Sequence, residues 1–557
     1  MRHPEPMTSG AEPTTRHGSP LEVTPAAIRL GPWSLYFLAK LALFWKELIG
    51  FHAYENLAFA AFLLVPAVSP AWRRTKAAVA LPAGVALLYH DSWLPPISRV
   101  FAQASLLASF DLSYFIELLG RFISWPTVAM LVIVWAAYQL LSRRVRVGVV
   151  VMGVLLMLAL TQRQPAPMPG GMAGVQAKPV AQGEAAGNAE QSLESALQSF
   201  YANESRRSVT FPTPAASAVP FDILFVHVCS LAWDDILAVG LDKHPLWQRF
   251  DMVLTHFNSA SSYSGPAAVR ILKSTCGQPS QAALYEPAPA NCYLMDSLQR
   301  SGFKPNLVMN HDGHFDDFLK LVQNQGKLSA PPMPLGGAPV AQYAFDSTPI
   351  FDDLAVLSRW LDQRKADATP RVATYYNTIS LHDGNHLAGA YSKRASLETY
   401  RPRLAKLFDD LDQFMQKIES SGRRAVVVMV PEHGAALRGD KMQIPGLREI
   451  PNPTITEVPV GIRVIGPELR RAGDALRIEA STSYLAMSQI IARLVEKSPF
   501  DGDSFAPADY TQGLPTTDFV AENEGMVVMR RQGAYFLRQG KDDWAAYTAS
   551  PQAAGQP

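Results

Sequence analysis

Several features that would narrow the function of this chain are missing from its sequence. Its 50 basic and 49 acidic residues nearly cancel, so nothing in the net charge favours nucleic acid as a partner. No internal repeat is visible in the sequence. Residues 1–30 are polar and proline-rich, so no cleavable signal peptide is apparent. Export would therefore depend on membrane-spanning segments farther along the chain.

Cysteine is also scarce, with only three in 557 residues. Cys276 and Cys292 enclose a short loop that a disulfide could close in an oxidising compartment. Cys229 is then left alone. An unpaired cysteine in an exported protein indicates either buried packing or a ligand role.

Long apolar runs are confined to the first third of the chain, although its length predicts two or more domains. We predict an N-terminal transmembrane domain over residues 1–162, because repeated apolar runs occur between residues 33 and 161. About five helices are expected there, some of them shorter than a perpendicular span requires. The expected spans are 34–50, 54–71, 77–92, 124–141 and 146–161.

Basic residues between the spans predict the orientation of this domain. Arg73 and Arg74 follow the second span, and Arg143 and Arg144 follow the fourth, so both loops should be cytoplasmic. Everything after Thr161 then lies outside the cytoplasm. The alternative for the first span is an interfacial helix, since it contains Lys40, Lys46 and Glu47; residues 93–123 have the composition of an external amphipathic or re-entrant segment.

The rest of the chain has the composition of a soluble domain. Residues 163–205 are predicted to form a flexible linker, rich in Pro, Gly, Ala and Gln, followed by a short helix over 190–205. From residue 206 to 557, strand-length apolar runs alternate with helical patterns, which predicts an α/β domain with a mainly parallel central sheet. Strands are expected at 221–228, 306–310, 372–381, 425–430 and 458–466, helices at 351–364, 393–420 and 481–496, and a hairpin turning at Gln532 and Gly533.

Two of these strands lead directly into potential metal ligands. FDILFVHVCS reaches Cys229, and AVVVMVPEHG reaches Glu432 and His433. Ligands bind beyond the carboxyl ends of the strands in open α/β sheets, so a thiolate, a carboxylate and an imidazole could converge there on one zinc ion. The alternative for Cys229 is a small buried hydrophobe. His227 should point to the opposite face of its strand, and we assign it to packing.

Ser264 precedes Gly265, Pro266 and a helical run, which places its hydroxyl near a helix N-terminus, where exposed amides favour an anion. It is either a plain N-cap serine or, beside a metal that lowers the pKa of an oxygen, a nucleophile.

Further polar groups follow other strands. His386 could stabilise a phosphoryl oxygen or protonate a leaving group, with His382 and Asp383 as alternatives. Arg448 could bind a phosphate through its guanidinium group, although a solvated surface arginine is the default interpretation. The motif HDGHFDD, at 311–317, has a metal-binding composition, but nothing in the sequence selects it.

Taken together, the segments FVHVCSL, SSYSGP, YNTISLHDGNH, VPEHG and GLREIP resemble the alkaline-phosphatase-like phosphoethanolamine transferases. The resemblance covers the whole chain and is closest to the branch that modifies cellulose. The wider superfamily usually has an acidic residue in place of Cys229 and an aspartate in place of Glu432. These departures therefore distinguish the cellulose branch.

This resemblance implies an alkaline-phosphatase-like domain in the periplasm, tethered to the bacterial inner membrane. It implies phosphatidylethanolamine as the donor, exported cellulose as the acceptor, membrane subunits of the cellulose synthase complex as partners, and a disulfide between Cys276 and Cys292. It further implies Zn²⁺ bound by Cys229, Ser264, Glu432 and His433, with the Ser264 oxygen as nucleophile, and a phosphoryl pocket lined by Tyr263, His386 and Arg448.

Three alternatives remain for the function. Within the superfamily, the chain could be a phosphoglycerol transferase or a sulfatase-like hydrolase, although such a hydrolase often needs a second metal and no second acidic set is obvious. Outside it, the chain could be a noncatalytic subunit of a polysaccharide secretion complex with a structural zinc ion. A zinc site closed by four protein ligands would favour that last alternative, whereas a Ser264 oxygen among the ligands would favour catalysis.

Overall fold

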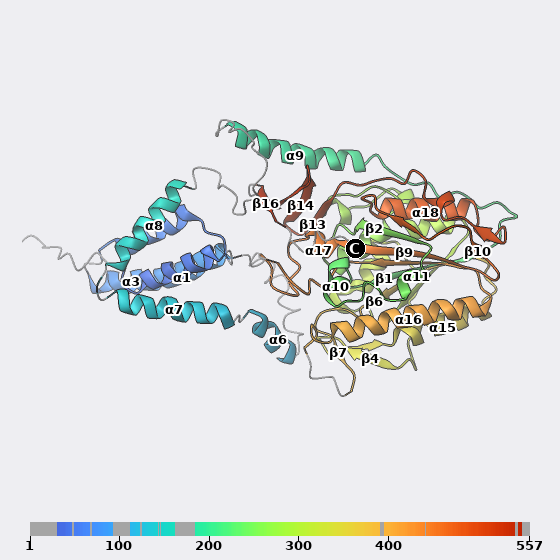
Figure 1. The fold of residues 1–557 in the computed structure, drawn as a ribbon, viewed down its shortest axis with the longest axis horizontal. Helices are drawn as coiled ribbons and strands as arrows, with labels where there is room; N and C mark the ends of the chain where they lie inside the picture. The colour runs from blue at the N-terminus through green and yellow to red at the C-terminus, as the bar shows by residue number, and fades with distance from the viewer. Residues whose placement is uncertain are drawn as a thin grey trace, which may run out of the picture. The chain divides into compact units, whose positions relative to one another are not determined.

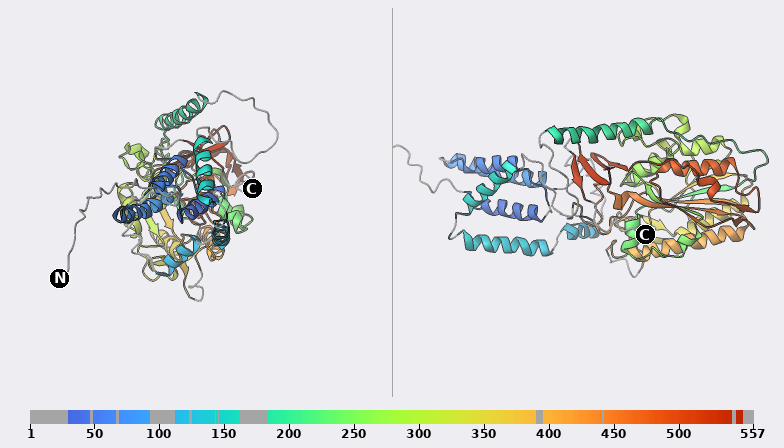
Figure 2. Two further views of the ribbon diagram at one scale, coloured as in Figure 1. Left: turned by 90° about the vertical axis from the view of Figure 1, so that its left-hand side faces the viewer. Right: turned by 45° about the horizontal axis from the view of Figure 1, so that its top comes forward.

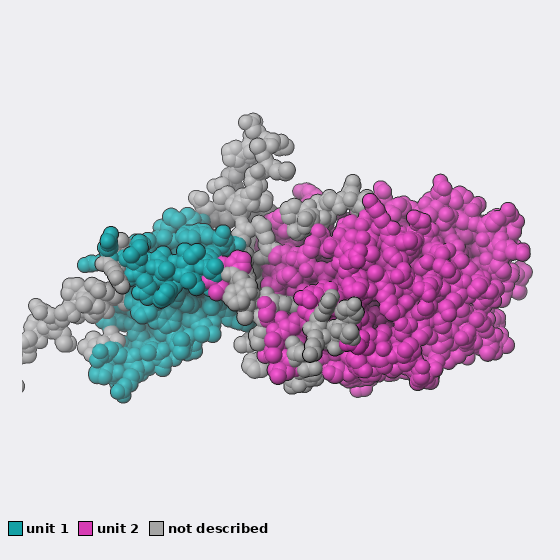
Figure 3. Space-filling view, turned by 60° about the horizontal axis from the view of Figure 1, so that its bottom comes forward, with its two compact units in different colours: residues 1–93, 129–170 teal, residues 94–128, 171–557 magenta. Residues whose placement is uncertain are grey.

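The structure, a computed structural model, describes residues 30–46, 49–66, 69–92, 112–122, 125–142, 144, 146–161, 184–389, 395–440, 442–540 and 544–548. The chain divides into two compact units, coloured separately in Figure 3. Unit 1 comprises Met1–Trp93 and Ala129–Gly170, and unit 2 comprises Leu94–Val128 and Gly171–Pro557.

Unit 1 is helical, and its helices overlap the five predicted spans. A core of apolar side chains, including Phe37, Phe59 and Val151, holds the helices together. Lys40 is buried within this unit, where its Nζ donates to Asn56 Oδ1 at 2.8 Å. The helices are α1 (Trp33–Trp45), α2 (Ala53–Leu64), α3 (Pro70–His90), α7 (Trp125–Leu141, shared between the units) and α8 (Val147–Thr161).

Among the described residues, no helix of the structure is both long enough and apolar enough to cross a bilayer. The transmembrane anchor therefore stays a prediction. Of the spacer predicted at 163–189, residues 163–183 lie outside the described residues. Residues 184–189 are helical instead, because α9 (Glu184–Glu204) begins six residues before the predicted helix.

Unit 2 is built around a sheet of seven strands in the order β11-β2-β9-β8-β1-β6-β3. Its strands are β1 (Asp222–Val228), β2 (Met252–Asn258), β3 (Lys304–Met309), β6 (Val372–Thr378), β8 (Ala425–Pro431), β9 (Glu457–Ile465) and β11 (Leu476–Ile478). Neighbouring strands are parallel except at β9, which runs antiparallel to both β8 and β2. The sheet is therefore mixed but mostly parallel, in agreement with the predicted fold class apart from the direction of β9.

Helices cover both faces of this sheet, as Figures 1 and 2 show. One face packs against α12 (Ser264–Leu272), α13 (Leu294–Arg300), α14 (Phe318–Asn324) and α18 (Tyr484–Glu496). The other packs against α10 (Trp233–Ala238), α11 (Leu246–Arg249), α15 (Asp353–Ala366) and α16 (Tyr400–Ser421). Every residue of β1, β6 and β8 is consequently buried, which explains the largely apolar sequences of β1 and β8.

Smaller elements complete unit 2. Helix α6 (Leu112–Phe122) is the described part of the segment predicted to be external, and α9 (Glu184–Glu204) includes most of the helix expected at 190–205. Three small sheets are formed by β4 (Val340–Tyr343), β5 (Pro349–Phe351) and β7 (His386–Leu387), by β10 (Arg470–Arg471) and β12 (Ser504–Phe505), and by β13 (Val520–Asn523), β14 (Met526–Arg531), β15 (Ala534–Gln539) and β16 (Ala545–Tyr547). The short helices are α17 (Pro453–Thr456), α19 (Ala508–Thr511), η2 (Ala283–Tyr285), η3 (Ala290–Cys292) and η4 (Phe315–Asp317).

Some predictions about local structure are confirmed and others are wrong. The hairpin turn is confirmed, because Gln532 and Gly533 link β14 to β15 with φ of 50° and 82°. The disulfide between Cys276 and Cys292 is also present, and Cys229 is a buried free thiol. The prediction missed β2, and it began the helix of α16 at 393 rather than at Tyr400.

Candidate metal centre

The candidate metal ligands lie at the carboxyl edge of the central sheet. Cys229 follows β1 directly, and Glu432 and His433 follow β8. The two strands are parallel neighbours, with Val228 opposite Pro431, so the chain leaves both strands at the same level. The backbone N–H of Glu432 donates to the carbonyl of Val228 at 2.8 Å, which extends the pairing to the first ligand residue.

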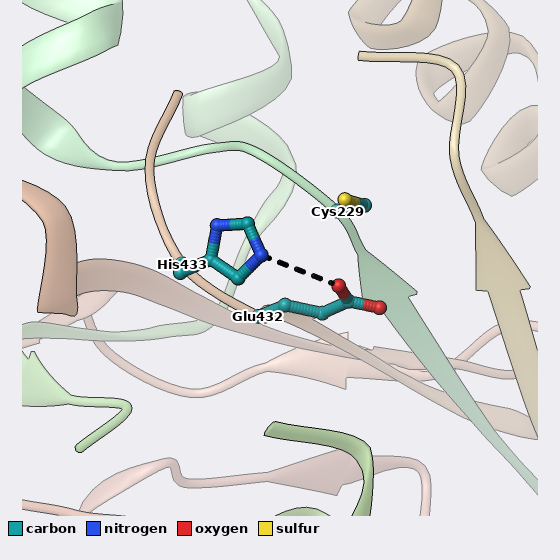
Figure 4. A group of neighbouring side chains, drawn as sticks. All are labelled: Cys229, Glu432 and His433. Atoms are coloured by element: carbon teal, nitrogen blue, oxygen red, sulfur yellow. Dashed lines mark ion pairs between the residues drawn. The ribbon is translucent and has the colours of Figure 1, made fainter. Parts of the chain in front are cut away.

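The three side chains converge in the protein interior (Figure 4). Cys229, Glu432 and His433 are buried, and one potential ligand atom from each lies within 4.8 Å of the others. Glu432 Oε2 lies 3.8 Å from His433 Nε2. The structure thus brings together the thiol, carboxyl and imidazole groups that the sequence suggested as ligands.

Ser264 joins this cluster as the first residue of α12. Its Oγ lies 3.3 Å from Cys229 Sγ and 3.4 Å from His433 Nε2. Because Ser264 begins a helix, its neighbouring backbone N–H groups carry a partial positive charge that favours an anion. The hydroxyl is therefore close to the candidate ligands and to amides suited to a phosphoryl group.

The donor atoms fit a zinc ion. His433 Nδ1 donates to the carbonyl of Gly434 at 2.9 Å, which leaves Nε2 without a proton and available as a ligand. Glu432 Oε2 is buried and has no hydrogen-bond partner among the described residues. A thiolate, an imidazole and a carboxylate form a typical zinc donor set.

The protonation states respond strongly to burial. Burial raises the pKa of the Cys229 thiol well above its usual range, and the negative charge of Glu432 raises it further. Burial also raises the pKa of Glu432 and lowers that of His433 well below its usual value. A divalent cation would reverse the effect on Cys229 and Glu432, because a metal binds their deprotonated forms.

Asn377 and His311 orient Glu432, and sequence reasoning did not identify either residue in this role. Asn377 Nδ2 donates to Glu432 Oε1 at 2.6 Å. The N–H of Gly313 donates to His311 Nδ1 at 3.1 Å, so His311 Nε2 carries the proton and donates to Asn377 Oδ1 at 2.8 Å. His311 belongs to the motif HDGHFDD, which was noted in the sequence without a partner.

Asp235 fixes the loops on either side of the centre and was also missed. Its carboxylate accepts backbone N–H groups from Ala232 at 3.1 Å, Ala435 at 2.7 Å and Leu437 at 3.2 Å. Burial raises its pKa to about 7. A Cβ at Gly434 would lie 2.7 Å from Asp235 Oδ2, so this close approach requires glycine.

Arg448 and Tyr263 lie beside the loop that carries Cys229. Arg448 is 8% exposed, donates from a terminal guanidinium nitrogen to Ser230 Oγ at 3.0 Å and lies 5.7 Å from the centre of the Tyr263 ring. Its Nε is buried without a partner among the described residues. The Tyr263 hydroxyl donates to Glu449 Oε1 at 2.5 Å. Arg448 is thus a buried cation near the cluster rather than a solvated surface residue.

The candidate histidines differ in their surroundings. His386 belongs to β7, outside the central sheet, and both of its ring nitrogens are buried without a hydrogen-bond partner in the described part of the chain. Burial and, to a lesser extent, the charge of Arg448 lower the pKa of His382 to about 4. The prediction that His227 points to the opposite face is wrong, because residues two positions apart on a strand share one face, as His227 and Cys229 do. Its Nδ1 lies 2.8 Å from the Tyr375 hydroxyl and 3.5 Å from Glu432 Oε1, so His227 packs against a candidate ligand.

Fold and site define an α/β domain with a candidate zinc centre and an adjacent serine hydroxyl at the carboxyl edge of its sheet. Two family models match this chain: the cellulose biosynthesis protein BcsG C-terminal domain over residues 176–544, and the corresponding N-terminal domain over residues 33–160. The chain belongs to the BcsG family.

Individual relatives agree with this assignment. The cellulose biosynthesis protein BcsG of Escherichia coli (strain K12) is 41% identical over 550 residues, which cover 93% of this chain and 96% of the relative. The protein of the same description from Salmonella typhimurium is 41% identical over 541 residues, with the same coverage. Among solved structures, an alkaline phosphatase superfamily protein from Vibrio parahaemolyticus has a TM-score of 0.45 and 12% identity, over 63% of this chain and 87% of that one.

Proposed function

We propose that this protein is a zinc-dependent phosphoethanolamine transferase that moves phosphoethanolamine from phosphatidylethanolamine to glucosyl hydroxyls of exported cellulose. Membership of the BcsG family, whose relatives are described as cellulose biosynthesis proteins, supports the acceptor. The sequence resemblance to phosphoethanolamine transferases supports the donor. The observation that carries the reaction type is the position of Ser264 Oγ, 3.3 Å from Cys229 Sγ and 3.4 Å from His433 Nε2.

Cys229, Glu432 and His433 would hold the zinc ion, with Ser264 completing the set. A bound zinc ion lowers the pKa of a hydroxyl and stabilises negative charge on phosphoryl oxygens. Within the described chain, this cluster contains three residues of the types His, Cys, Asp and Glu. A fourth ligand position is therefore left for the serine hydroxyl. A fourth His, Cys, Asp or Glu ligand in place of the Ser264 oxygen would instead favour a structural role.

In the first half of the reaction, Ser264 Oγ forms a bond to the donor phosphorus, and its proton leaves. The bond between phosphorus and the diacylglycerol oxygen breaks, and that oxygen takes up a proton as diacylglycerol departs. Phosphoethanolamine is then covalently attached to Ser264. The guanidinium group of Arg448 balances charge on the phosphoryl oxygens, while the N-terminal amides of α12 provide further donors.

In the second half, a glucosyl hydroxyl attacks the same phosphorus, and the bond to Ser264 Oγ breaks. The acceptor loses a proton and Ser264 regains one, so both halves balance. We assign the proton transfer to His386, whose buried ring nitrogens have no protein partner among the described residues, with His382 as the alternative. Tyr263 would form one wall of the phosphoryl pocket beneath Arg448.

We further propose that residues 1–162 anchor the enzyme in the bacterial inner membrane, with residues 206–557 in the periplasm. Large apolar side chains exposed on α7 and α8 support this location, among them Ile133, Leu140, Val149 and Leu160, each at least 60% exposed. An anchor would bring the catalytic domain close to a lipid donor. It would also place the enzyme beside membrane subunits of the cellulose synthase complex.

Intact-mass analysis of the full chain tests the proposal directly. After incubation with phosphatidylethanolamine in detergent micelles, the zinc-loaded protein should gain one phosphoethanolamine group, and peptide mapping should locate it on Ser264. Ser264→Ala and chelator-treated wild type should remain unmodified. An unmodified but zinc-loaded wild-type protein would favour the noncatalytic alternative. A gain of one phosphoglycerol group when phosphatidylglycerol replaces phosphatidylethanolamine as the donor would favour the phosphoglycerol alternative.

A further inference from the structure

Helix α6 contacts the segment that follows β6, whose described residues are 379–389 and 395–399. This segment contains the candidate histidines His382 and His386. Tyr114 is 7% exposed, and its hydroxyl donates to Asp383 Oδ2 at 3.3 Å. Glu117 lies three residues later, on the same face of the helix, and accepts the backbone N–H of Ser396 at 3.2 Å. Asp383 in turn accepts the Ser396 hydroxyl at 2.5 Å. One face of α6 therefore binds both Asp383 and Ser396, which are also hydrogen-bonded to each other.

The aromatic ring of Tyr114 packs against the same segment. Its centre lies 5.7 Å from that of Phe345, which lies 5.6 Å from the ring of His382. Gly384 has a φ of +81°, and a Cβ there would lie 2.8 Å from Tyr114 Cε2. Glycine at this position therefore allows both the backbone turn and the close approach of α6.

Arg403, on α16, holds the segment from another element. Its guanidinium group is buried and donates to the carbonyls of Ser380 at 2.9 Å, His382 at 3.1 Å and Ser396 at 2.8 Å. A buried cation needs negative partners, and Asp383 and Glu117 both act on it electrostatically. Helix α6 thus contributes one of the charges that compensate Arg403.

The segment begins at the metal centre. The carbonyl of Thr378, the last residue of β6, accepts the backbone N–H of Cys229 at 3.0 Å. Asp383 follows five positions later, and His386 three positions after that. A shift of the segment at Asp383 would therefore move His386 relative to the residues around Cys229.

We propose that α6 is a positioning element of the catalytic site: Tyr114 and Glu117, through Asp383 and Ser396, fix the place of His386 relative to Ser264. This inference rests on the proposed role of His386 in proton transfer. It makes α6, which precedes the predicted spacer at 163–189 and lies between two predicted membrane spans, part of the catalytic unit. Tyr114 and Glu117 are positioning residues, since they act through the segment and not on the substrate.

Steady-state kinetics of the full chain test the proposal, with phosphatidylethanolamine micelles as donor, cellopentaose as acceptor and diacylglycerol release as the signal. Glu117→Ala should lower kcat about tenfold while donor KM changes less than about twofold, because displaced catalytic groups slow chemistry more than binding. Glu117→Gln, which retains an acceptor for Ser396 N–H, should recover much of the loss. Glu398→Gln, at an exposed position near Ser396, is the matched control and should behave as wild type.

Hydrogen exchange of peptides within 379–389 provides a readout independent of activity. Exchange there should accelerate in Glu117→Ala and in Tyr114→Phe but not in Glu398→Gln. Unchanged exchange, a rise in KM alone, or a lower melting temperature with kcat intact would each overturn the positioning role. If the wild type formed no Ser264 adduct while exchange still responded, the proposed function would fail and the contact between α6 and the segment would stand.

Discussion

Asn377 Nδ2 donates to Glu432 Oε1 at 2.6 Å and leaves Oε2, the other carboxylate oxygen, 3.8 Å from His433 Nε2. The amide therefore decides which oxygen of Glu432 faces the candidate zinc centre. His311 fixes the amide in turn, because its Nε2 proton selects Asn377 Oδ1. His311, from the motif HDGHFDD, thus orients the candidate ligand Glu432 through the side chain of Asn377.

Replacing Asn377 should weaken zinc binding without removing a ligand. We expect Asn377→Ala to lower the zinc affinity about 10–100-fold, which is the usual effect of losing a group that orients a ligand. Competition with a chromogenic chelator measures this affinity. Asn258→Ala is the control, because Asn258 is also buried and donates to the carbonyl of Val520 at 2.9 Å. Equal affinities of the two variants would contradict the orienting role.

Zinc binding should depend on pH. Burial raises the pKa of both Cys229 and Glu432, so burial favours the protonated form of each group when no cation is present. Zinc binds the deprotonated forms, and its affinity should therefore increase as the pH rises. Calorimetry in two buffers of different ionisation enthalpy should show release of about one to two protons per ion. Binding without proton release would argue against Cys229 as a ligand.

A buried ion pair at the opposite end of β1 should affect stability alone. The Asp222 carboxylate accepts from Arg364 at 2.9 Å, from Arg423 at 3.1 Å and from the N–H of Val372 at 3.0 Å. Asp222→Ala should cost about 3–5 kcal/mol because it removes the buried carboxylate that pairs with Arg364, which keeps only the more exposed Asp367 as an acidic partner. Urea unfolding followed by tryptophan fluorescence gives this value.

The exposed pair of Arg470 and Asp503 is the control for Asp222, since both side chains are at least 75% exposed. Asp503→Ala should change stability by only about 0–1 kcal/mol. Zinc affinity should match wild type in both variants. A loss of zinc affinity in Asp222→Ala at full folding would show that the two ends of β1 are coupled.

The disulfide between Cys276 and Cys292 closes a loop of sequence separation 16. Removing it by the double substitution Cys276→Ser and Cys292→Ser should lower the free energy of unfolding by about 3 kcal/mol, the entropy cost of freeing a loop of this length. Reductant should destabilise the wild type by the same amount and leave the double variant unchanged. If reductant also lowered the free energy of unfolding of the double variant, its effect on the wild type would not be due to the disulfide alone.

Much of the central sheet could be predicted because its strands are buried on both faces. β8 is an unbroken apolar run, β1 is apolar except for Asp222 and His227, and parallel pairing places the residues after them at the same edge. β2 was missed because Thr255 and His256 interrupt its apolar pattern. The antiparallel direction of β9 could not be predicted, since a buried strand has the same pattern in either direction.

The residues that support the candidate site were harder to find. Asn377 lies inside a buried strand and Asp235 inside a short helix, where neither spacing nor composition indicates a partner. Their contacts depend on how β1, β6 and β8 lie side by side, and that order is a property of the topology. The roles of Ser264, Tyr263, His386 and Arg448 stay predictions.

The pairing of Val228 with Pro431 has a consequence for how this protein can change over evolution. Adding or deleting one residue within either strand would carry one ligand about 3.3 Å along the sheet and turn its side chain to the other face. Strand length at these two positions is therefore constrained by metal chemistry, whereas the outer loops can vary in length without disturbing the centre. Insertions in related sequences should accordingly avoid β1 and β8.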